Sequence, residues 1–577
     1  MSQANQHVRF EPDEHPSLLM TMGAGVQGAM IIVGAIVLGV VIVMRAAEQP
    51  QDYISWAVFA ALLVSGSTTI LQAVRLWRFG SGHILIMGTS GAFLAACVAA
   101  LVNGGPALMA TLIVASSLMQ FLIGMNLSLT RRIFIPVVTG TVIMLIAATV
   151  MPIAFSLLDA VEPGQPVEGA MASAAVTLAI TGGLILRAPP SLRLWSPVIG
   201  IAAGTATSAV FGLYDTSIIT EAAWFGAPFQ EWPGLSLDIG AEFWALLPAF
   251  AMVTAVGAIE TLGDGVAIQR VSRRNPPAPD FRVAQGAINA DGVGNLLSGL
   301  AGTVPNTTYS SSVAMVEITG VGARRVGVVI GLTFILFAFF PKVSAILVAI
   351  PSPVAGAYMT VLIGLLFVQG MKIVINDGVD HRKAAIIGLA FWAGAGFTNG
   401  QIFGESFGDG FMSLLLENGM TGGAIVALIM VLFLEVTSQR RKKLRLDGGP
   451  EGFSQLRDFL QEFASNSKWS EDAASRLTLV GEEALSGLLA ENGTEPDEGR
   501  RTVVSVRGVG TAAELEFVSG PADGNLEDRL AVLGESPEIT DENELSYRLL
   551  RHYAAAVRHS KYYGLDIVTV HVDQRAE

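Results

Sequence analysis

The sequence is poor in cysteine and in charged residues. Cys97 is the single cysteine among 577 residues, which excludes a disulfide framework and a cysteine-based metal site. Charged residues make up 15% of the chain and hydrophobic residues 51%, and the mean hydropathy is +0.54. So much apolar surface cannot be hidden in one soluble core. The composition therefore predicts a polytopic membrane protein.

The two ends lack the apolar runs that fill the middle of the chain. No short apolar stretch with a small-residue cleavage site follows Met1, so residues 1–18 are expected to be a cytosolic lead rather than a signal peptide. Residues 19–437 form the expected transmembrane domain, and 438–452 a basic linker. Residues 453–577 contain no run long enough to span a bilayer. This cytosolic domain carries most of the net charge of −14, which therefore says little about the substrate.

Fourteen apolar blocks are candidate membrane spans, since a span needs about 20 mostly apolar residues. They lie near 19–45, 55–75, 83–101, 106–127, 133–157, 168–187, 195–212, 242–268, 284–301, 308–320, 326–349, 353–375, 383–398 and 420–437. Lys and Arg collect in alternate connections, and the loop 213–243 on the opposite side has none. The positive-inside rule then predicts that both termini are cytoplasmic, in a cell (inner or plasma) membrane.

Fourteen spans divide into two sets of seven, so two similar halves would have opposite orientations. Residues 82–96 and 302–320 each open with an extended, small or β-branched stretch that runs into a helix, and each is third in its half. Flexible connecting loops are the alternative interpretation. An inverted repeat with two interrupted helices predicts a ligand site at the repeat interface near mid-membrane.

Two acids, Glu260 and Asp264, lie inside the apolar block 242–268. Their i, i+4 spacing places both on one helix face. Ionisable groups at such depth mark ion or proton pathways, so we predict that both take part in ion coupling and that Glu260 also binds substrate. The alternatives are a structural hydrogen bond between helices, or an Asp264 close enough to the interface to be solvated.

Weaker candidates for the substrate site are polar side chains in the first, third and tenth segments. A single amide in the first span is equally explained by a hydrogen bond between helices. Hydroxyls and backbone amides at a helix start can donate hydrogen bonds to an anionic or carbonyl group of a ligand. The candidates are Gln27, Ser90, Ser310, Ser311 and Ser312.

Several stretches together resemble the nucleobase–ascorbate transporter family, also called nucleobase:cation symporter-2. They are "IMGTSGAF", "FIPVVTGTVIMLIA", "ETLGDG", "GAINADGVGNLLSGLAGTVPNTTYSSS" and "IPSPVAGAYMTVLIGLL". The resemblance covers roughly residues 15–440. It implies a fourteen-span 7+7 inverted repeat of core and gate domains, usually dimeric, that moves purines, pyrimidines or related compounds with protons or sodium.

By the same resemblance, Glu260 would hydrogen-bond the base and Asp264 would support or couple it, while Ala92 and Phe93 would supply a backbone amide and a stacking ring. The chain departs from the family pattern in the tenth segment, where Ser311 and Ser312 replace Gln-Asn or Glu-Asn. In the first span, Gly28 replaces a usual histidine after Gln27. Losing a long bidentate partner weakens discrimination between bases, so the solute stays open.

The C-terminal domain is predicted to be an α/β sandwich. Apolar spacing predicts helices over 469–493 and 543–564, and alternation predicts strands over 501–508, 512–520 and 565–573. The domain resembles histidine-kinase-like ATPases, through "LVGEEALSGLL" for the N-box helix and "GPADGN" for the glycine box, with Gly487 in place of the asparagine that would hold magnesium. Two hypotheses follow: a nucleotide-binding regulatory module, or a retired ATPase fold kept for dimerisation or docking of a protein partner.

The function predicted from the sequence is secondary active transport of a nucleobase-like or related small polar solute, proton-coupled through Glu260, with sodium as the other coupling ion. One alternative is a membrane sensor that signals through the cytosolic domain. The other is an anion transporter of the related 7+7 fold. We expect a homodimer in the lipid bilayer, no enzymatic activity, no cofactor, no metal site and no nucleic-acid partner.

Overall fold

The computed structural model describes residues 5–125, 135–161, 165–228, 232–236, 239–398, 419–437, 441–447, 450–490, 501–509, 512–519, 542–562 and 565–574. The chain divides into two compact units. The membrane unit comprises residues 6–274 and 283–433. The second unit comprises residues 434–577 with two short segments, 1–5 and 275–282.

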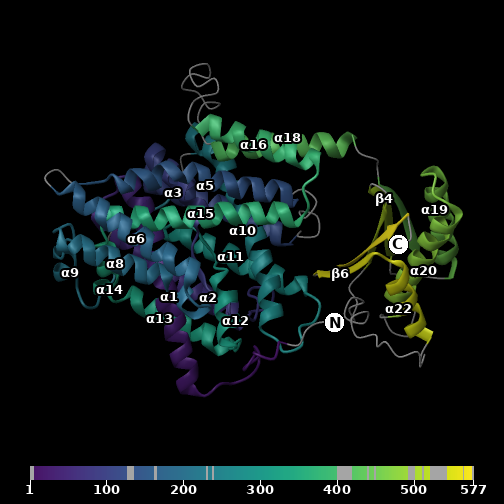
Figure 1. Ribbon diagram of the computed structural model, residues 1–577, viewed down its shortest axis with the longest axis horizontal. Helices are drawn as coiled ribbons and strands as arrows, with labels where there is room; N and C mark the ends of the chain where they lie inside the picture. Colours follow the sequence, from purple (N-terminus) through teal and green to yellow (C-terminus); the bar gives the residue numbers. More distant parts are fainter. Residues whose placement is uncertain are drawn as a thin grey trace. The chain divides into compact units, whose positions relative to one another are not determined.

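Long apolar helices dominate the membrane unit (Figure 1). Among the described residues, seven helices are long and apolar enough to cross a bilayer, or eight if the bent pair α13 (Arg324–Ala338) and α14 (Pro341–Val348) is one span. The seven are α1 (Leu18–Ala46), α2 (Gln51–Val74), α3 (Leu94–Met125) with the short 3-10 turn η1 (Gly91–Phe93) before it, α5 (Pro136–Leu158), α6 (Val167–Arg187), α10 (Ala241–Val271) and α15 (Ser352–Asn376).

The remaining helices of this unit are shorter or more polar than those seven. They are α7 (Pro190–Arg193), α8 (Ser196–Val210), α9 (Ser217–Glu221), α11 (Phe281–Ala301), α12 (Ser311–Thr319), α16 (His381–Thr398) and α18 (Gly419–Thr437). The third and fourth expected spans are the two limbs of α3, which breaks at Gly105. Gly105 has φ of 73°, a region that glycine enters without a Cβ clash, and Pro106 follows it.

Two short strands interrupt the helices of the membrane unit. β1 (Met87–Thr89) precedes η1 and α3, and β2 (Asn306–Thr308) precedes α12. The strands are antiparallel, with Met87 opposite Thr308 and Thr89 opposite Asn306, and all six residues are buried. This pairing joins the starts of two helices that are more than 200 residues apart in the chain.

Close helix contacts in the membrane unit occur at glycines. A Cβ on Gly66 of α2 would lie 2.5 Å from the carbonyl oxygen of Gly331 on α13, and a Cβ on Gly370 of α15 would lie 2.6 Å from the carbonyl oxygen of Gly140 on α5. Helices α5 and α15 run side by side (Figure 1). Small residues let membrane helices approach this closely, so that van der Waals contact holds them together.

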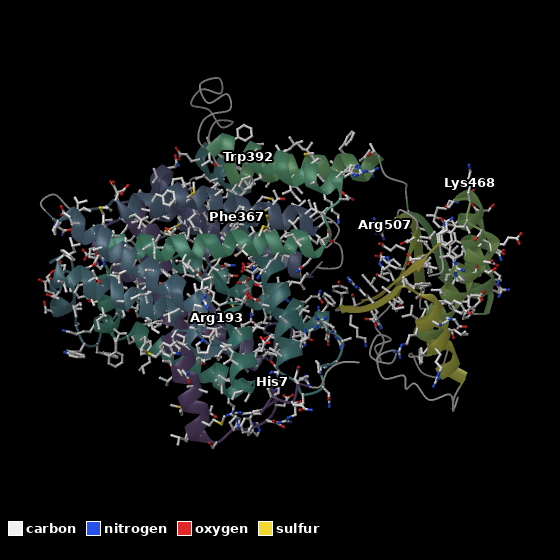
Figure 2. The ribbon with its side chains drawn as sticks, in the orientation of Figure 1. His7, Arg193, Phe367, Trp392, Lys468 and Arg507 are labelled. Atoms are coloured by element: carbon white, nitrogen blue, oxygen red, sulfur yellow. The ribbon has the colours of Figure 1, made fainter. Side chains whose placement is uncertain are left out.

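The segment that follows His7 (Figure 2) packs along the membrane unit instead of hanging free. The Arg9 amide donates to the Gly320 carbonyl at 2.7 Å, and the Gly322 amide donates to the Phe10 carbonyl at 2.7 Å. The Arg274 guanidinium, just past α10, donates to both carboxylate oxygens of Glu14, at 2.7 and 2.8 Å. The segment therefore joins the end of α10 to the turn between α12 and α13.

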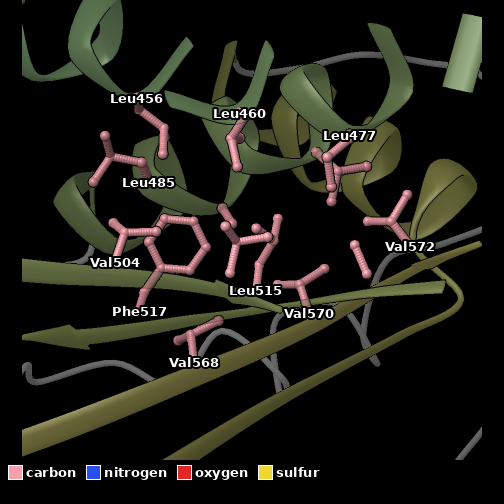
Figure 3. Packing of buried hydrophobic residues seen from close by; sticks show 14 of the residues in the cluster. Leu456, Leu460, Leu477, Leu485, Val504, Leu515, Phe517, Val568, Val570 and Val572 are labelled. Atoms are coloured by element: carbon pink, nitrogen blue, oxygen red, sulfur yellow. The ribbon is translucent and has the colours of Figure 1, made fainter. Parts of the chain in front are cut away.

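The second unit contains a five-stranded antiparallel sheet in the order β3-β4-β5-β7-β6. The strands are β3 (Lys442–Asp447), β4 (Arg501–Val509), β5 (Ala512–Ser519), β6 (Ala556–Tyr562) and β7 (Leu565–Asp573), and the helices are α19 (Pro450–Asn466), α20 (Glu471–Ala490) and α22 (Glu542–Tyr553). Leucines of α19 and α20 pack on valines, Leu515 and Phe517 of the sheet (Figure 3). One layer of helices thus covers one face of the sheet.

Two parts of this unit differ from the sequence prediction. The helix predicted over 543–564 ends at Tyr553, because residues 556–562 form β6 and pair along their whole length with β7. Val557, His559 and Lys561 are more buried than their neighbours 556, 558 and 560, which is the two-residue period of a strand. The predicted linker 438–452 contains β3, which pairs with β4. The "GPADGN" stretch lies outside the described residues.

Candidate functional site

Hydrogen bonds from β2 and from the residue before α12 hold the Asp264 side chain in place. It projects from α10 and is 6% exposed. The Ser310 hydroxyl donates to Asp264 Oδ1 at 2.7 Å, and the Thr308 hydroxyl donates to Oδ2 at 2.8 Å. Both carboxylate oxygens therefore have partners from β2 or the residue before α12, and Asp264 ties α10 to the paired strands.

A second buried acid, Asp291, lies behind Asp264. The Thr308 and Thr261 hydroxyl oxygens are 3.3 Å apart, and Thr261 donates to Asp291 Oδ2 at 2.9 Å. The Gln120 side-chain amide donates to the same oxygen at 2.6 Å. Asp291 Oδ1 has no hydrogen-bond partner among the described residues, although the side chain is 0% exposed. A polar chain thus connects two acids on α10 and α11.

The hydrogen-bond network continues from Gln120 through Asn295 to Asn306 of β2. Asn295 donates to the Gln120 amide oxygen at 2.7 Å, and the Asn306 backbone amide donates to the Asn295 side-chain oxygen at 2.7 Å. These buried hydrogen bonds join α3, α11 and β2, and breaking one would leave a buried polar group unpaired at a cost of about 1–3 kcal/mol. The network therefore fixes β2 relative to α3 and α11.

Glu260 has a different environment from Asp264, one helical turn away. Its side chain is half-buried, and Oε1 accepts a hydrogen bond of 3.2 Å from the Gln369 side-chain amide on α15. This is the one hydrogen bond to Glu260 in the described part of the molecule. The Glu260 side chain therefore reaches from α10 to α15 and keeps one carboxylate oxygen without a described hydrogen bond, whereas each oxygen of Asp264 has one.

The first interruption, residues 90–93, contacts both the second interruption and α10. The Ser90 amide donates to the Pro305 carbonyl at 2.8 Å, and the buried Ser90 hydroxyl has no hydrogen-bond partner among the described residues. Ala92 and Phe93 are buried. The Phe93 ring lies 6.0 Å from the Phe250 ring of α10. Residues 90–93 are therefore packed against the helix that carries both predicted acids.

The structure brings together some of the predicted residues but not all. Ser310 contacts Asp264, whereas Ser312 donates to the Tyr309 carbonyl at 2.6 Å and accepts from the Ile86 amide at 2.9 Å, so its bonds are structural. Ser311 is half-buried, and Gln27 is exposed on α1. No described hydrogen bond joins Ser311 or Gln27 to the acids, and their binding roles stay predictions.

Sequence reasoning missed most polar residues near the predicted acids, among them Thr308, Asp291 and Gln369. Asp291 had a usable signal, since an acid inside the apolar block 284–301 meets the rule that selected Glu260. Thr308 lay within a stretch noted only for its extended character. Nothing in the sequence around Gln369 marks it, because its contact depends on how α15 packs against α10.

The chain is similar to a family model, to permeases of other organisms and to a solved transporter structure. The family model Xan_ur_permease, described as "Permease family", matches residues 19–402. Xanthine permease XanP of Escherichia coli (strain K12) is 28% identical over 455 residues, covering 75% of this chain and 96% of that protein. Putative purine permease CPE0397 of Clostridium perfringens is 29% identical over 377 residues, covering 64% and 80%. The transmembrane domain of a cyanobacterium bicarbonate transporter, BicA, matches with a TM-score of 0.48 and 15% identity, covering 74% of this chain and 100% of that chain.

Proposed function

This chain belongs to the Permease family, the nucleobase–ascorbate transporters, and we propose that it is a symporter of a purine, a pyrimidine or a related small polar solute. Similar proteins are named as a xanthine permease and a putative purine permease. The chain is a multi-pass membrane transporter and not an enzyme. The solute and the mode of coupling are the parts that we propose.

The observation that carries the proposal is the contrast between Glu260 and Asp264. An ionised carboxylate accepts hydrogen bonds at two oxygens. Asp264 has both of its oxygens occupied by hydroxyls, whereas Glu260 has one bond, to a side chain of another helix. The ring N–H groups of a nucleobase can donate hydrogen bonds to the Glu260 carboxylate. We therefore assign base recognition to Glu260 and support of the site to Asp264.

Proton coupling through Glu260 follows from the charge balance of the region. Glu260, Asp264 and Asp291 lie in or beside one polar network, and no Lys or Arg in the described residues forms an ion pair with them. Buried acids without a cation need a proton, an ion or a ligand as compensation. Cotransport of a proton, or of sodium, with the neutral base would supply it.

The finer architecture belongs to the same proposal. Fourteen spans in a 7+7 inverted repeat, with core and gate domains, are supported by the matched position of β1 and β2 before α3 and α12. The basic connections favour cytoplasmic termini in the inner or plasma membrane. A homodimer stays a prediction from the family.

For the second unit, we propose docking of a protein partner or a second copy instead of nucleotide hydrolysis. If the resemblance to histidine-kinase-like ATPases holds, Gly487 stands where an asparagine would hold magnesium. On the same helix, Leu485 and Leu488 are buried in the core under the sheet, so α20 serves packing. Phosphate binding would require backbone amides and a metal ligand, and the described residues do not supply the ligand at position 487.

Uptake by purified protein in liposomes tests the proposal. Labelled xanthine, urate and uracil are supplied with and without an inward proton gradient, and with sodium replaced by potassium. The gradient should drive accumulation by the wild type and not by Glu260→Gln. Glu168→Gln, which changes an exposed acid in the first turn of α6, is the matched control and should transport normally.

Each alternative has its own outcome in this assay. Base binding without flux would favour a sensor, and bicarbonate flux without base flux would favour an anion transporter. Unchanged gradient-driven uptake by Glu260→Gln would refute the coupling role.

A further inference from the structure

A base-binding site needs both donors and acceptors close to Glu260, because the edge of a nucleobase carries ring N–H groups beside carbonyl oxygens. A carboxylate can only accept. The tenth segment supplies Ser311, a short side chain that makes no hydrogen bond in the described part of the molecule. A donor with a longer reach must therefore come from another element.

Gln369 of α15 is such a donor. Its Nε2 lies 3.2 Å from Glu260 Oε1, and the side chain is half-buried. The Gln369 amide oxygen makes no hydrogen bond within the described residues. One carboxamide offers two N–H donors and a carbonyl acceptor in one plane. Beside Glu260 it completes a mixed array of donors and acceptors.

The backbone at this position is held in place by the next residue. Gly370 packs against Gly140 of α5, where a Cβ would lie 2.6 Å from the Gly140 carbonyl oxygen. Phe367, two residues before Gln369, is exposed on the same helix (Figure 2). The α5–α15 contact therefore fixes where the Gln369 side chain starts, and preorganised groups bind with a smaller ordering cost.

We propose that Gln369 is a substrate-binding residue that determines specificity, taking the place of the long polar side chain absent from the tenth segment. This inference rests on the proposed function. In the structure, Gln369 donates to Glu260. With ligand, a ring N–H donates to Glu260, and the neighbouring carbonyl accepts from Gln369 Nε2. The pair selects cyclic lactams and imides, the oxo-bases, over amino-bases without that carbonyl.

Equilibrium binding to the purified full-length protein tests the assignment, with xanthine and uracil as oxo-bases and adenine as the amino-base. Gln369→Leu keeps the bulk and removes both hydrogen-bonding groups. We expect it to weaken binding of the oxo-base that the wild type prefers by about tenfold to a hundredfold, since leaving a ligand carbonyl without its donor has roughly that effect. Its preference over adenine should fall by a similar factor.

Two further variants make the result specific. Gln51→Leu changes an exposed glutamine in the first turn of α2 and should bind like the wild type. Gln369→Asn keeps the amide but withdraws it by one methylene, so it should weaken binding of the same ligands. It provides the test if Gln369→Leu does not fold. Thermal unfolding of each ligand-free variant reports folding separately from binding.

The outcomes separate the two proposals. If the wild type binds an oxo-base and Gln369→Leu binds it with the same affinity and ligand order, the assignment of Gln369 is wrong and the proposed function stands. Tighter binding by Gln369→Leu would also overturn the assignment, because the amide would then be a competitor of the ligand. If the wild type binds and transports no base, the proposed function itself fails.

Discussion

Replacing Thr308 by valine is the sharpest test of the buried network. The substitution keeps the branched shape of the side chain and removes one hydroxyl. That hydroxyl donates to Asp264 Oδ2 at 2.8 Å and lies 3.3 Å from the Thr261 hydroxyl. Because Thr308 is 1% exposed, water cannot readily replace the lost donor.

The expected cost follows from the charge on the acceptor. A hydrogen bond to a charged group contributes about 1.5–3 kcal/mol, and a buried group left unpaired costs its full desolvation. Thr308→Val should therefore destabilise the protein by about 1.5–3 kcal/mol. Thr308→Ser keeps the hydroxyl and loses one methyl group, about 0.8 kcal/mol, so it should lie between Thr308→Val and the wild type.

The neighbouring residue of the same strand provides the matched control. Thr307 is also buried, at 5% exposure, but its hydroxyl has no hydrogen-bond partner among the described residues. Removing an unsatisfied polar group is neutral or stabilising, so Thr307→Val should unfold at or above the wild-type temperature. The same chemical change, one residue apart, thus has opposite predicted signs.

The assay is thermal unfolding of the detergent-purified protein, followed by the fluorescence of its 8 tryptophans, with xanthine binding measured in parallel. The expected order of midpoints is Thr307→Val at or above the wild type, then Thr308→Ser, then Thr308→Val. Equal midpoints for Thr307→Val and Thr308→Val would refute the reasoning, because the Asp264 bond would then contribute nothing.

Two more predictions concern helix packing and the N-terminal segment. Gly66→Ala places a Cβ 2.5 Å from the Gly331 carbonyl oxygen, so overpacking should cost about 1–3 kcal/mol and lower the unfolding midpoint, while Gly34→Ala, with no atom within 4 Å, should not lower it. The hydrogen bond from Arg274 holds the pKa of Glu14 at about 2, so the charged pair stabilises the segment above the ordinary carboxyl pKa of about 4.5 and loses this contribution as pH falls toward 2. Glu14→Gln should therefore increase proteolysis of the segment at pH 7 and make little difference near pH 2, measured with an acid-tolerant protease; equal cleavage at pH 7 would contradict this.

Local patterns in the sequence predicted the elements of the site better than their partners. Glu260 and Asp264 became candidates because acids in an apolar run are costly and their spacing defines one helix face, and their roles stay predictions. The extended character of residues 82–96 and 302–320 was readable as well. Their pairing, Gly88 opposite Thr307, was not, because strand register depends on contacts between distant segments.

The errors have physical causes of the same kind. The alanines at 554–556 favour a helix locally, yet β6 begins at the last of them, Ala556, because pairing with β7 outweighs that preference. Asp291 lies in a stretch rich in glycine and asparagine, which weakened its signal as an acid in an apolar helix. Gln369 reaches Glu260 across 109 residues of sequence, so only packing reveals it.

Glu260 and Asp264 of α10 accept hydrogen bonds from different elements, so a movement of one element affects only one of the two acids. The partners of Asp264 lie on β2 and the residues just after it, and the buried network holds that strand in place. The partner of Glu260 belongs to α15, which packs on α5. A displacement of α15 relative to α10 therefore breaks the Glu260 bond and leaves those of Asp264 intact. Under the proposed function, a base or a proton that binds Glu260 in place of Gln369 would by linkage change the free energy of that displacement. Glu260 and Gln369 are therefore the pair through which we propose that ligand, proton and helix movement are coupled.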